Sequence, residues 1–487
     1  MTIPNPDQGD HPRAVTPRVA VFAPYWTFWE PSVGPGLRSR RRELLQSVVD
    51  RLQDHGVEVV GHTQPERSLV ADPDQGRQWA TEAAGHDPDV LLVVQTMAAP
   101  PSHALAVLDH MAQPVVIWAL QDAAVIPADF SAGHITSLGA TVGTPMLTNV
   151  LHRLERPFEL VVSAPHDDQA ASAVASRLRA GAVAGRLVGS RLARVGRPMV
   201  GYACVDADDE ELARALGLEV VALSPLELKQ RYDAVSDEEL ARQRRTAAGY
   251  QQEPPPDPTE NLDRSLRLAA ALEALDRAGG FAAGAMNCHV PEIRFGPDPG
   301  LTPCYGLGCE TTRGVPWSCT GDVLTAVALL VGKQLSGAAL YHEVEAIDFA
   351  TGEVAVANSG EHDLGWCPAD RTPSLGPNPW FAADERTGYR IRFELPAGPA
   401  SMIGFAHQPD HPSGFGFVVA EGHITGRELP DNPTVGGMFR FSHEPVTEAW
   451  TRWAAAGVNH HSAISPGHLG SAVAAMANFA RVGCTVI

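Results

Sequence analysis

The sequence lacks the features that mark membrane-spanning, secreted or nucleic-acid-binding proteins. No stretch of its 487 residues approaches the roughly 20 consecutive apolar residues that span a bilayer, and the polar, proline-containing N-terminus has no apolar signal core. Basic residues are few, because 37 Lys and Arg stand against 57 Asp and Glu and give a formal net charge of −20. Nucleic acids and anionic membranes require a basic surface, so we expect neither as a partner. The sequence predicts a cytoplasmic protein.

Two further absences limit the chemistry. The seven cysteines contain no CxxC pair, which argues against a zinc ribbon, and their odd number argues against a disulfide framework. Cys288, Cys304, Cys309 and Cys319 are close in sequence, but we interpret them as small buried residues rather than a zinc site. No glycine-rich loop follows the first predicted strand, so nucleotide binding is not supported.

The length predicts two to four domains. We expect a flexible leader at residues 1–16, then two regions, 17–164 and 165–335, in which short apolar strands alternate with helices. That pattern is typical of parallel α/β domains. From 336 to 487 short alternating strands dominate, which predicts an antiparallel sheet or small barrel with one closing helix at Ser465. The predicted fold class is therefore α/β, with two parallel-sheet α/β domains followed by a β-rich C-terminal domain.

Residues 318–363 carry the densest set of side chains that could take part in catalysis or metal binding. A helix is expected with Thr320 as its N-cap and Asp322 in its first turn, followed by two strands joined by a turn. Glu343 lies on the first strand, and His362 follows the second. A carboxylate and an imidazole at neighbouring strand ends are typical ligands of a divalent metal.

Four ordered segments resemble the L-fucose and L-arabinose isomerases. These are CTGDVLTAVAL (Cys319–Leu329), the acidic strand around Glu343, NSGEHD (Asn358–Asp363) and the closing segment that begins GVNHHSAISPGHLG (Gly457–Ile487). The resemblance implies a metal-dependent aldose–ketose isomerase that uses Mn²⁺ and acts on a small sugar or sugar derivative. It also implies an active site between the second and third domains, and a homo-oligomer of three or six subunits.

The resemblance also implies roles for individual residues. Glu343, His362 and His460 match metal-binding positions, and Glu343 is also a candidate base. Glu345 is the second choice after Glu343, and His461 is the second choice after His460. We expect His468 in the first turn of the last helix. The segment around His289 and Glu292 resembles the wall of the substrate pocket, so both are candidate substrate contacts.

One position departs from the family pattern. The isomerases carry a glutamate directly after the position of Cys319, where it binds metal and transfers a proton, and this chain has Thr320. A threonine hydroxyl is a poor general base and a poor ligand for a hard metal ion. Either Asp322 or Glu310 supplies the missing carboxylate, with Thr320 as a substrate contact, or the site performs another reaction.

Three functions therefore stay open. The first is a sugar ketol-isomerase. The second is a metal enzyme of the same ancestry that performs epimerisation or elimination on a sugar or polyol derivative. The third is a non-catalytic sugar-binding protein, because two α/β lobes also describe sugar-binding proteins and a fold does not by itself decide function.

Overall fold

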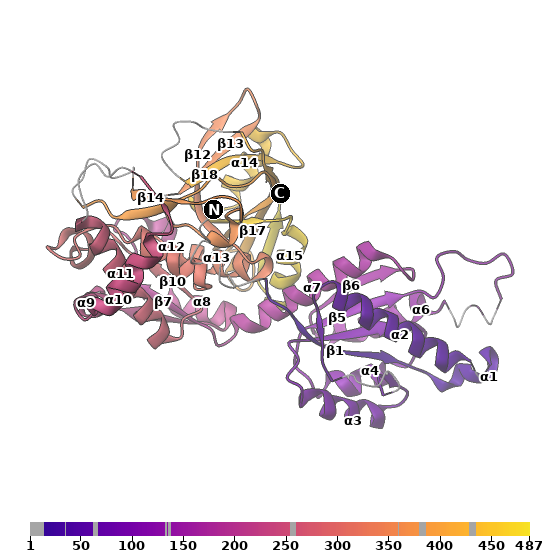
Figure 1. Cartoon of the computed structure of the whole chain (residues 1–487). Coiled ribbons are helices and arrows are strands. Elements are labelled where there is room, and N and C mark those ends of the chain that lie inside the picture. Colours follow the sequence, from indigo (N-terminus) through magenta and orange to yellow (C-terminus); the bar gives the residue numbers. More distant parts are fainter. Residues whose placement is uncertain are drawn as a thin grey trace. The chain divides into compact units, whose positions relative to one another are not determined.

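The structure is a computed structural model that describes residues 14–34, 36–61, 67–131, 134, 138–253, 260–358, 360–378, 386–427 and 435–487. The chain forms two compact units (Figure 1). The N-terminal unit comprises Val15–Arg186 with Ala475–Arg481, and the larger unit contains Leu187–Ala474 with Val482–Ile487. None of the helices in the described ranges combines the length and the apolar character needed to cross a bilayer.

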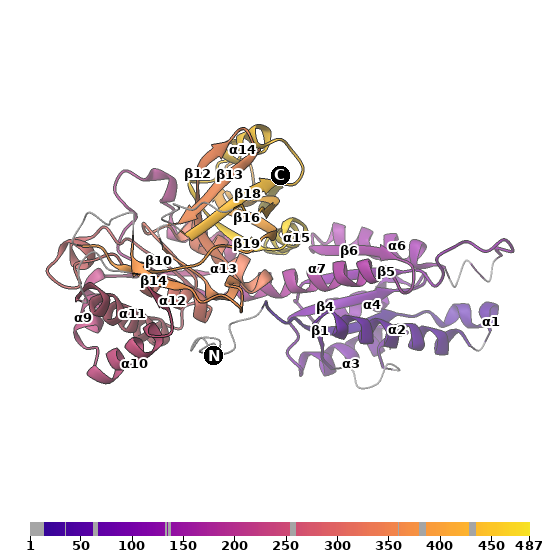
Figure 2. The ribbon, with the colours of Figure 1, turned by 45° about the horizontal axis from the view of Figure 1, so that its top comes forward.

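A parallel sheet forms the centre of the N-terminal unit, with strand order β2-β1-β4-β5-β6 and β3 beside β1. Every residue of β4 and β5 is buried, as expected for strands that helices cover on both faces (Figure 2). The strands are β1 (Arg18–Pro24), β2 (Glu58–Val59), β3 (Leu69–Val70), β4 (Val90–Gln95), β5 (Val115–Leu120) and β6 (Phe158–Ser163). The helices are α1 (Glu30–Val33), α2 (Leu37–Asp54), α3 (Pro73–Ala84), α4 (Pro101–Leu108), α6 (Ala140–Arg153) and α7 (Asp168–Leu187).

The larger unit begins with a second parallel sheet of order β11-β10-β7-β8. Its strands are β7 (Arg191–Val195), β8 (Glu219–Leu223), β10 (Ala283–Met286) and β11 (Trp317–Ser318). Its helices are α8 (Asp209–Leu216), α9 (Pro225–Asp233), α10 (Asp237–Ala247), α11 (Glu260–Gly279) and α12 (Cys304–Arg313). A small additional sheet joins β9 (Gln251–Gln252), β14 (Ser374–Pro377) and β15 (Tyr389–Arg392).

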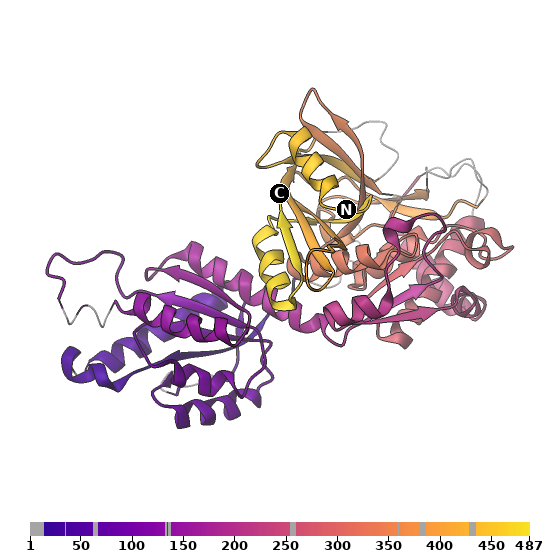
Figure 3. The ribbon, with the colours of Figure 1, turned by 180° about the vertical axis from the view of Figure 1, so that it is seen from behind.

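The last part of the larger unit is a β-rich sheet of order β16-β19-β12-β13-β18-β17-β20. Because β16 also pairs with β17, six of its described strands close into an antiparallel ring, and β20 adds to β17 in parallel (Figure 3). The strands are β12 (Leu340–Asp348), β13 (Glu353–Asn358), β16 (Gly398–His407), β17 (Phe415–Ile424), β18 (Val435–Phe441), β19 (His461–Pro466) and β20 (Gly483–Val486). Two helices accompany them, α14 (Val446–Ala455) and α15 (Gly470–Ala480).

One buried helix joins the two sheets of the larger unit. Helix α13 (Val323–Ser336) packs against β10 of the parallel sheet and against β16 and β19 of the ring. Nearly all its residues are buried, and its sequence is apolar on every side, as a helix covered all round requires. Its N-terminus therefore lies where the two sheets meet, and the loop before it is fixed there.

The predicted fold class is confirmed: parallel α/β sheets precede a β-rich C-terminal part. Two local predictions were wrong. Ser465 lies within strand β19 instead of capping the last helix, which starts at Gly470. The cap of α13 is Asp322 rather than Thr320.

Candidate metal centre

The candidate site begins with two adjacent strands of the ring. Strands β12 and β19 run antiparallel, and Glu343 lies directly opposite His461 in their register. Residues that face each other in this way project to the same side of a sheet. The pairing therefore brings together two side chains that are 118 positions apart in the sequence.

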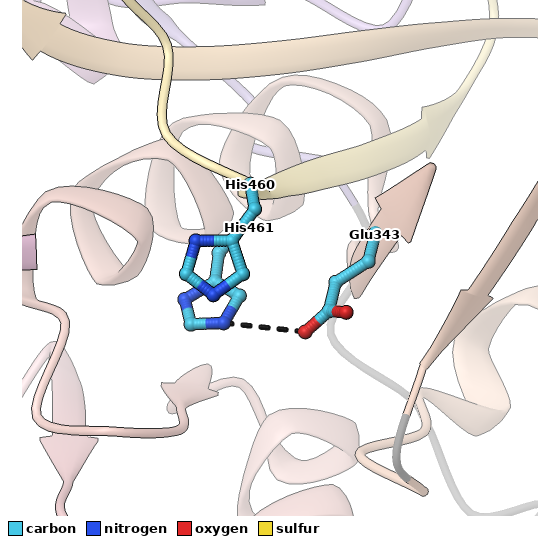
Figure 4. A group of neighbouring side chains, drawn as sticks. All are labelled: Glu343, His460 and His461. Atoms are coloured by element: carbon cyan, nitrogen blue, oxygen red, sulfur yellow. Dashed lines mark ion pairs between the residues drawn. The ribbon is translucent and has the colours of Figure 1, made fainter. Parts of the chain in front are cut away.

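Glu343, His460 and His461 form a compact group that could hold a metal ion, with one potential ligand atom from each within 4.8 Å of the others. The Nε2 atom of His461 lies 3.2 Å from a carboxylate oxygen of Glu343. Figure 4 shows this ion pair, with the ring of His460 beside that of His461. His461 is buried, Glu343 is half-buried and His460 is exposed, so the group is open on the His460 side.

Asp322 holds His461 from its other ring nitrogen. The carboxylate is fully buried and caps α13, accepting hydrogen bonds from the backbone N–H and the hydroxyl of Thr325 at 2.9 and 2.7 Å. It also accepts a hydrogen bond from the Asn459 amide at 2.9 Å and lies 3.1 Å from Nδ1 of His461. His461 thus lies between two carboxylates, and Asn459 accepts its backbone N–H.

The electrostatics follow from this arrangement. Burial lowers the pKa of His461, but its hydrogen bonds to Asp322 and Glu343 outweigh burial and raise that pKa to about 9. Burial raises the pKa of Glu343, and the contacts with His461 reverse this and hold it below its usual value. The pKa of His460 is lowered by burial and by the charge of His461. Together these shifts favour a protonated His461 beside the Glu343 carboxylate and disfavour a second positive charge on His460.

The donor set fits a divalent transition metal. One carboxylate oxygen and two imidazole nitrogens are ligands that Mn²⁺, Zn²⁺ and similar ions accept, and three protein ligands leave positions for a substrate. Nδ1 of His461 is engaged with Asp322, so Nε2 is the nitrogen that faces the group. His460 is further positioned by the Tyr202 ring, 5.4 Å away, and by the Cys204 thiol, 3.8 Å from its Nδ1.

Thr320 lies in the loop before α13 in an unusual conformation. Its φ of +54° is in the left-handed region, which a β-branched residue rarely adopts, and Gly321 follows with φ +76°. The Thr320 hydroxyl is buried and has no hydrogen-bond partner among the described residues. A strained backbone and an unsatisfied buried hydroxyl are both typical of a functional site rather than of a structural loop.

Two of the three residues predicted to contact substrate line one cavity, whereas Thr320 is not part of its wall. The cavity has a volume of about 1560 Å³ and opens at the carboxyl ends of β7, β8 and β10, the edge where parallel sheets commonly bind ligands. His289 and Glu292 both lie in its wall, together with Arg197, Asn287 and His407. Tyr202 lines it as well and connects it to His460.

Other predicted residues lie elsewhere. His362 is fully buried beside Gly308 of α12 and does not belong to the compact group of Glu343, His460 and His461. Burial lowers its pKa to about 3, and its Nε2 has no hydrogen-bond partner among the described residues. Glu310 is buried in α12, where it forms an ion pair with Arg313 and a side-chain hydrogen bond with Asp276. Its charge is therefore engaged in a different cluster.

Of the other residues considered from the sequence, one belongs to the group of Glu343, His460 and His461 and two do not. Glu345 is exposed on β12, where burial and the charge of Glu343 raise its pKa. His468, expected in the first turn of the last helix, precedes that helix, and its Nε2 lies 3.0 Å from the backbone oxygen of Gly422. His461, also a second choice, is the residue at the centre of the group.

Sequence reasoning missed two further residues. Asn459 was treated only as the neighbour of a histidine, although it holds both Asp322 and the backbone of His461. Glu361 was not weighed at all, yet it is a buried carboxylate whose charge adds to burial in raising the pKa of the Cys304 thiol. A signal existed for Glu361, because an acidic residue directly precedes His362 in a segment that carries the family resemblance.

Comparison with known proteins finds relatives that are named as sugar isomerases. No family model matches the chain. It is 23% identical to the sulfoquinovose isomerase of Clostridium sp. (strain MSTE9) over 326 residues, which cover 66% of this chain and 70% of the relative. It is 21% identical to the sulfoquinovose isomerase of Priestia aryabhattai over 74% of this chain and 78% of the relative. It is 24% identical to the L-arabinose isomerase of Clavibacter sepedonicus over 82% of this chain and 80% of the relative.

These matches confirm the resemblance found in the sequence. The chain is similar to sulfoquinovose and L-arabinose isomerases at 21 to 24% identity over 66 to 82% of its length.

Proposed function

We propose that this protein is a metal-dependent sugar ketol-isomerase, which interconverts an aldose and a ketose. The observation that carries the proposal is the line Asp322–His461–Glu343, with His460 beside it, in a homologue of sugar isomerases. A buried histidine fixed between two carboxylates is a costly arrangement for a site with no function, and it is common where a metal is bound.

Glu343, His460 and His461 would hold the ion, for which we propose Mn²⁺. When bound, a divalent ion supplies Lewis-acid stabilisation of the negative charge that develops on the sugar oxygens. Asp322 accepts a hydrogen bond from the Nδ1–H of His461, which orients the ring and leaves Nε2 as the ligand atom. The cavity wall at His289 and Glu292 would hold the sugar hydroxyl groups by hydrogen bonds.

For proton transfer we propose Glu361. The two carboxylates considered from the sequence have other partners: Asp322 accepts four hydrogen bonds, and Glu310 is paired with Arg313. Glu361 is buried and lies three residues beyond the end of β13. In the register of β12 and β13, Glu343 lies opposite Ala357, so Glu361 follows four residues beyond the strand position that faces a proposed metal ligand. Burial is the main cause that raises the pKa of Tyr341, and the charges of Cys319, Glu343 and Glu361 add to it.

Tyr341 in turn contacts the proposed metal ligands. Its ring lies 4.8 Å from that of His461, and it occupies the strand position two residues before Glu343. Glu361 is therefore a carboxylate close to the site that does not depend on position 320. Glu361→Gln should lower the rate of ketose formation by about 100-fold or more while metal content is retained, in line with the loss of a general base.

The replacement of the family glutamate by Thr320 favours a second candidate, a metal enzyme that performs epimerisation or elimination on a sugar or polyol derivative. A non-catalytic sugar-binding protein is the third, and the paired carboxylates around His461 speak against it. A homo-oligomer of three or six subunits and a cytoplasmic location stay predictions from the resemblance and the composition.

One experiment separates the three. Protein loaded with Mn²⁺ is incubated in D₂O with L-arabinose, L-fucose or sulfoquinovose, and the sugars are followed by NMR. A ketose carrying deuterium at C1, with deuterium at C2 of the recovered aldose, supports isomerisation. Deuterium exchange with an epimer or a dehydrated product supports the second candidate. Sugar binding by calorimetry without exchange or product supports the third.

The control is a matched pair of variants. Glu343→Gln should lose metal and activity together, whereas Glu448→Gln, on the exposed side of α14, should behave as the unchanged protein. If Glu343→Gln keeps full metal content and full activity, the proposed centre is wrong.

A further inference from the structure

Two buried thiols lie side by side next to the loop that precedes α13. The Sγ atoms of Cys288 and Cys319 are 3.3 Å apart, and both side chains are buried. Cys319 directly follows β11, and Cys288 lies two residues beyond β10, its parallel neighbour in the sheet. The order of the strands therefore brings together two cysteines that are 31 positions apart.

This pair has the chemistry of a reversible oxidation site. A separation of 3.3 Å is a thiol–thiol hydrogen bond, and only about 1 Å of movement separates it from the S–S bond length of about 2.05 Å. The hydrogen bond from Cys319 is the main cause that lowers the pKa of the Cys288 thiol to about 5; burial opposes it, and the neighbouring His289 assists it. A thiolate is the form that reacts with oxidants, and a thiol in contact is the group that resolves the product.

We propose that Cys288 and Cys319 are a redox modification site that a peroxide converts into a disulfide. The Cys288 thiolate attacks hydrogen peroxide, which gives the sulfenic acid and hydroxide. The Cys319 thiol then attacks that sulfur, the S–S bond forms and water leaves. Overall the two thiols lose two hydrogen atoms, and the peroxide is reduced to two molecules of water. A dithiol reverses the step by thiol–disulfide exchange.

The disulfide would act on the metal centre through three residues. Cys319 is followed by Thr320 and Gly321, which are both left-handed, and then by Asp322, which holds His461. A loop with two consecutive residues in this conformation has little freedom to absorb a shift of Cys319. We therefore expect the disulfide to move Asp322 and to weaken metal binding by about 10-fold. This is the lower end of the roughly 10- to 100-fold loss in affinity that follows when a group that orients a metal ligand is removed. This last step rests on the proposed function, whereas formation of the disulfide does not.

The first test needs no variant. The full chain is treated with hydrogen peroxide, blocked with N-ethylmaleimide under denaturing conditions, digested with trypsin without reductant and analysed by mass spectrometry. The tryptic peptides 278–294 and 314–333 each contain one cysteine, Cys288 and Cys319 respectively. We expect these two peptides to appear as one linked species that dithiothreitol separates. Sulfinic or sulfonic acid on Cys288 without the linked species, or both thiols still blocked by maleimide, would overturn the proposal.

Variants supply the second test. Cys288→Ser and Cys319→Ser should each abolish the linked species, and Cys484→Ser, a half-buried cysteine in β20, should leave it unchanged. Mn²⁺ binding is then measured by calorimetry before and after peroxide. The unchanged protein and Cys484→Ser should lose about 10-fold in affinity and recover it with dithiothreitol, while Cys319→Ser should not respond. A disulfide that forms without any loss of affinity would reject the link to the metal centre but not the disulfide.

Discussion

The Nδ1 atom of His461 lies 3.1 Å from a carboxylate oxygen of Asp322, a residue 139 positions earlier in the chain. Asp322 is also the cap of α13, so one carboxylate both starts the central helix and orients the histidine. The position of a candidate metal ligand is thereby fixed by a helix of the larger unit that is buried along nearly all its length.

We predict that Asp322→Asn weakens metal binding by about 10- to 100-fold, because asparagine carries no charge for His461. It should also lower the unfolding temperature, since asparagine can still cap α13 but its amide nitrogen cannot accept the hydrogen bonds that one carboxylate oxygen accepts from the Thr325 hydroxyl, Asn459 and His461. Calorimetric titration with Mn²⁺ measures the first effect, and thermal unfolding measures the second. Asp72→Asn is the matched control, since Asp72 caps α3 and lies in the N-terminal unit. An unchanged affinity in Asp322→Asn would show that the contact with His461 has no role in binding.

His461 should matter more than His460. His461 is buried between two carboxylates, whereas His460 is exposed. We expect His461→Ala to remove bound metal almost completely and His460→Ala to reduce the affinity by about 10- to 100-fold. Metal content after dialysis, measured by plasma mass spectrometry, ranks the two, with His468→Ala as a control that keeps full metal. The opposite ranking would return His460 to the central position that the sequence suggested.

Thr320 gives a prediction about stability. At an ordinary position alanine stabilises a protein more than glycine does, but at a φ of +54° glycine avoids a steric cost of about 1 kcal/mol. Thr320→Gly should therefore unfold at a higher temperature than Thr320→Ala, by about 2 °C. Differential scanning calorimetry of both variants without metal checks the order. A higher unfolding temperature for the alanine variant would mean that the loop relaxes to ordinary dihedral angles.

The cluster around Asp276 predicts a pH dependence. Burial, with the nearby charge of Glu310, raises the pKa of Asp276 to about 9, although Trp317 Nε1 donates a hydrogen bond to it at 2.9 Å. The folded-state pKa lies above the value of about 4 for an unfolded aspartate, so the protonated form is favoured by folding. The stability it contributes is complete below about pH 4 and is lost as the pH rises towards 9.

Asp276→Asn keeps an oxygen acceptor for Trp317 and removes the titration. The unfolding temperature of this variant relative to the unchanged protein should therefore be higher at pH 8 than at pH 5, by about 2 °C or more. Asp263→Asn, in a surface ion pair with Arg244, provides the comparison. Equal differences at both pH values would mean that Asp276 titrates normally.

The sequence was sufficient for the broad architecture, because periodicity reports which faces of strands and helices are buried. It placed Glu343 on a strand, and Glu343 lies in β12 as expected. It could not decide between His460 and His461, since that choice depends on the register of β19 against β12, and a shift of one residue exchanges the faces. The predicted N-cap of α13 was two residues too early, because hydrophobic periodicity does not report the left-handed conformation of Thr320 and Gly321.

The contact between Cys288 and Cys319 was beyond sequence reasoning for a different reason. Their spacing fits no metal-binding or disulfide pattern, and they meet only because β10 and β11 are neighbours in the sheet. Strand order is a property of the whole unit, so a contact that depends on it cannot be derived from a local motif.

Strand β19 lies between β16 and β12, although it follows both of them in the chain by more than fifty residues. A nascent chain must therefore keep a place open between two strands, with exposed backbone edges, until residues 461–466 have been synthesised. The strand that finally fills this place starts with His461. Closure of the ring and completion of the candidate metal centre are thus one event, so a molecule that stops short of the closed fold cannot take up the ion in its native geometry.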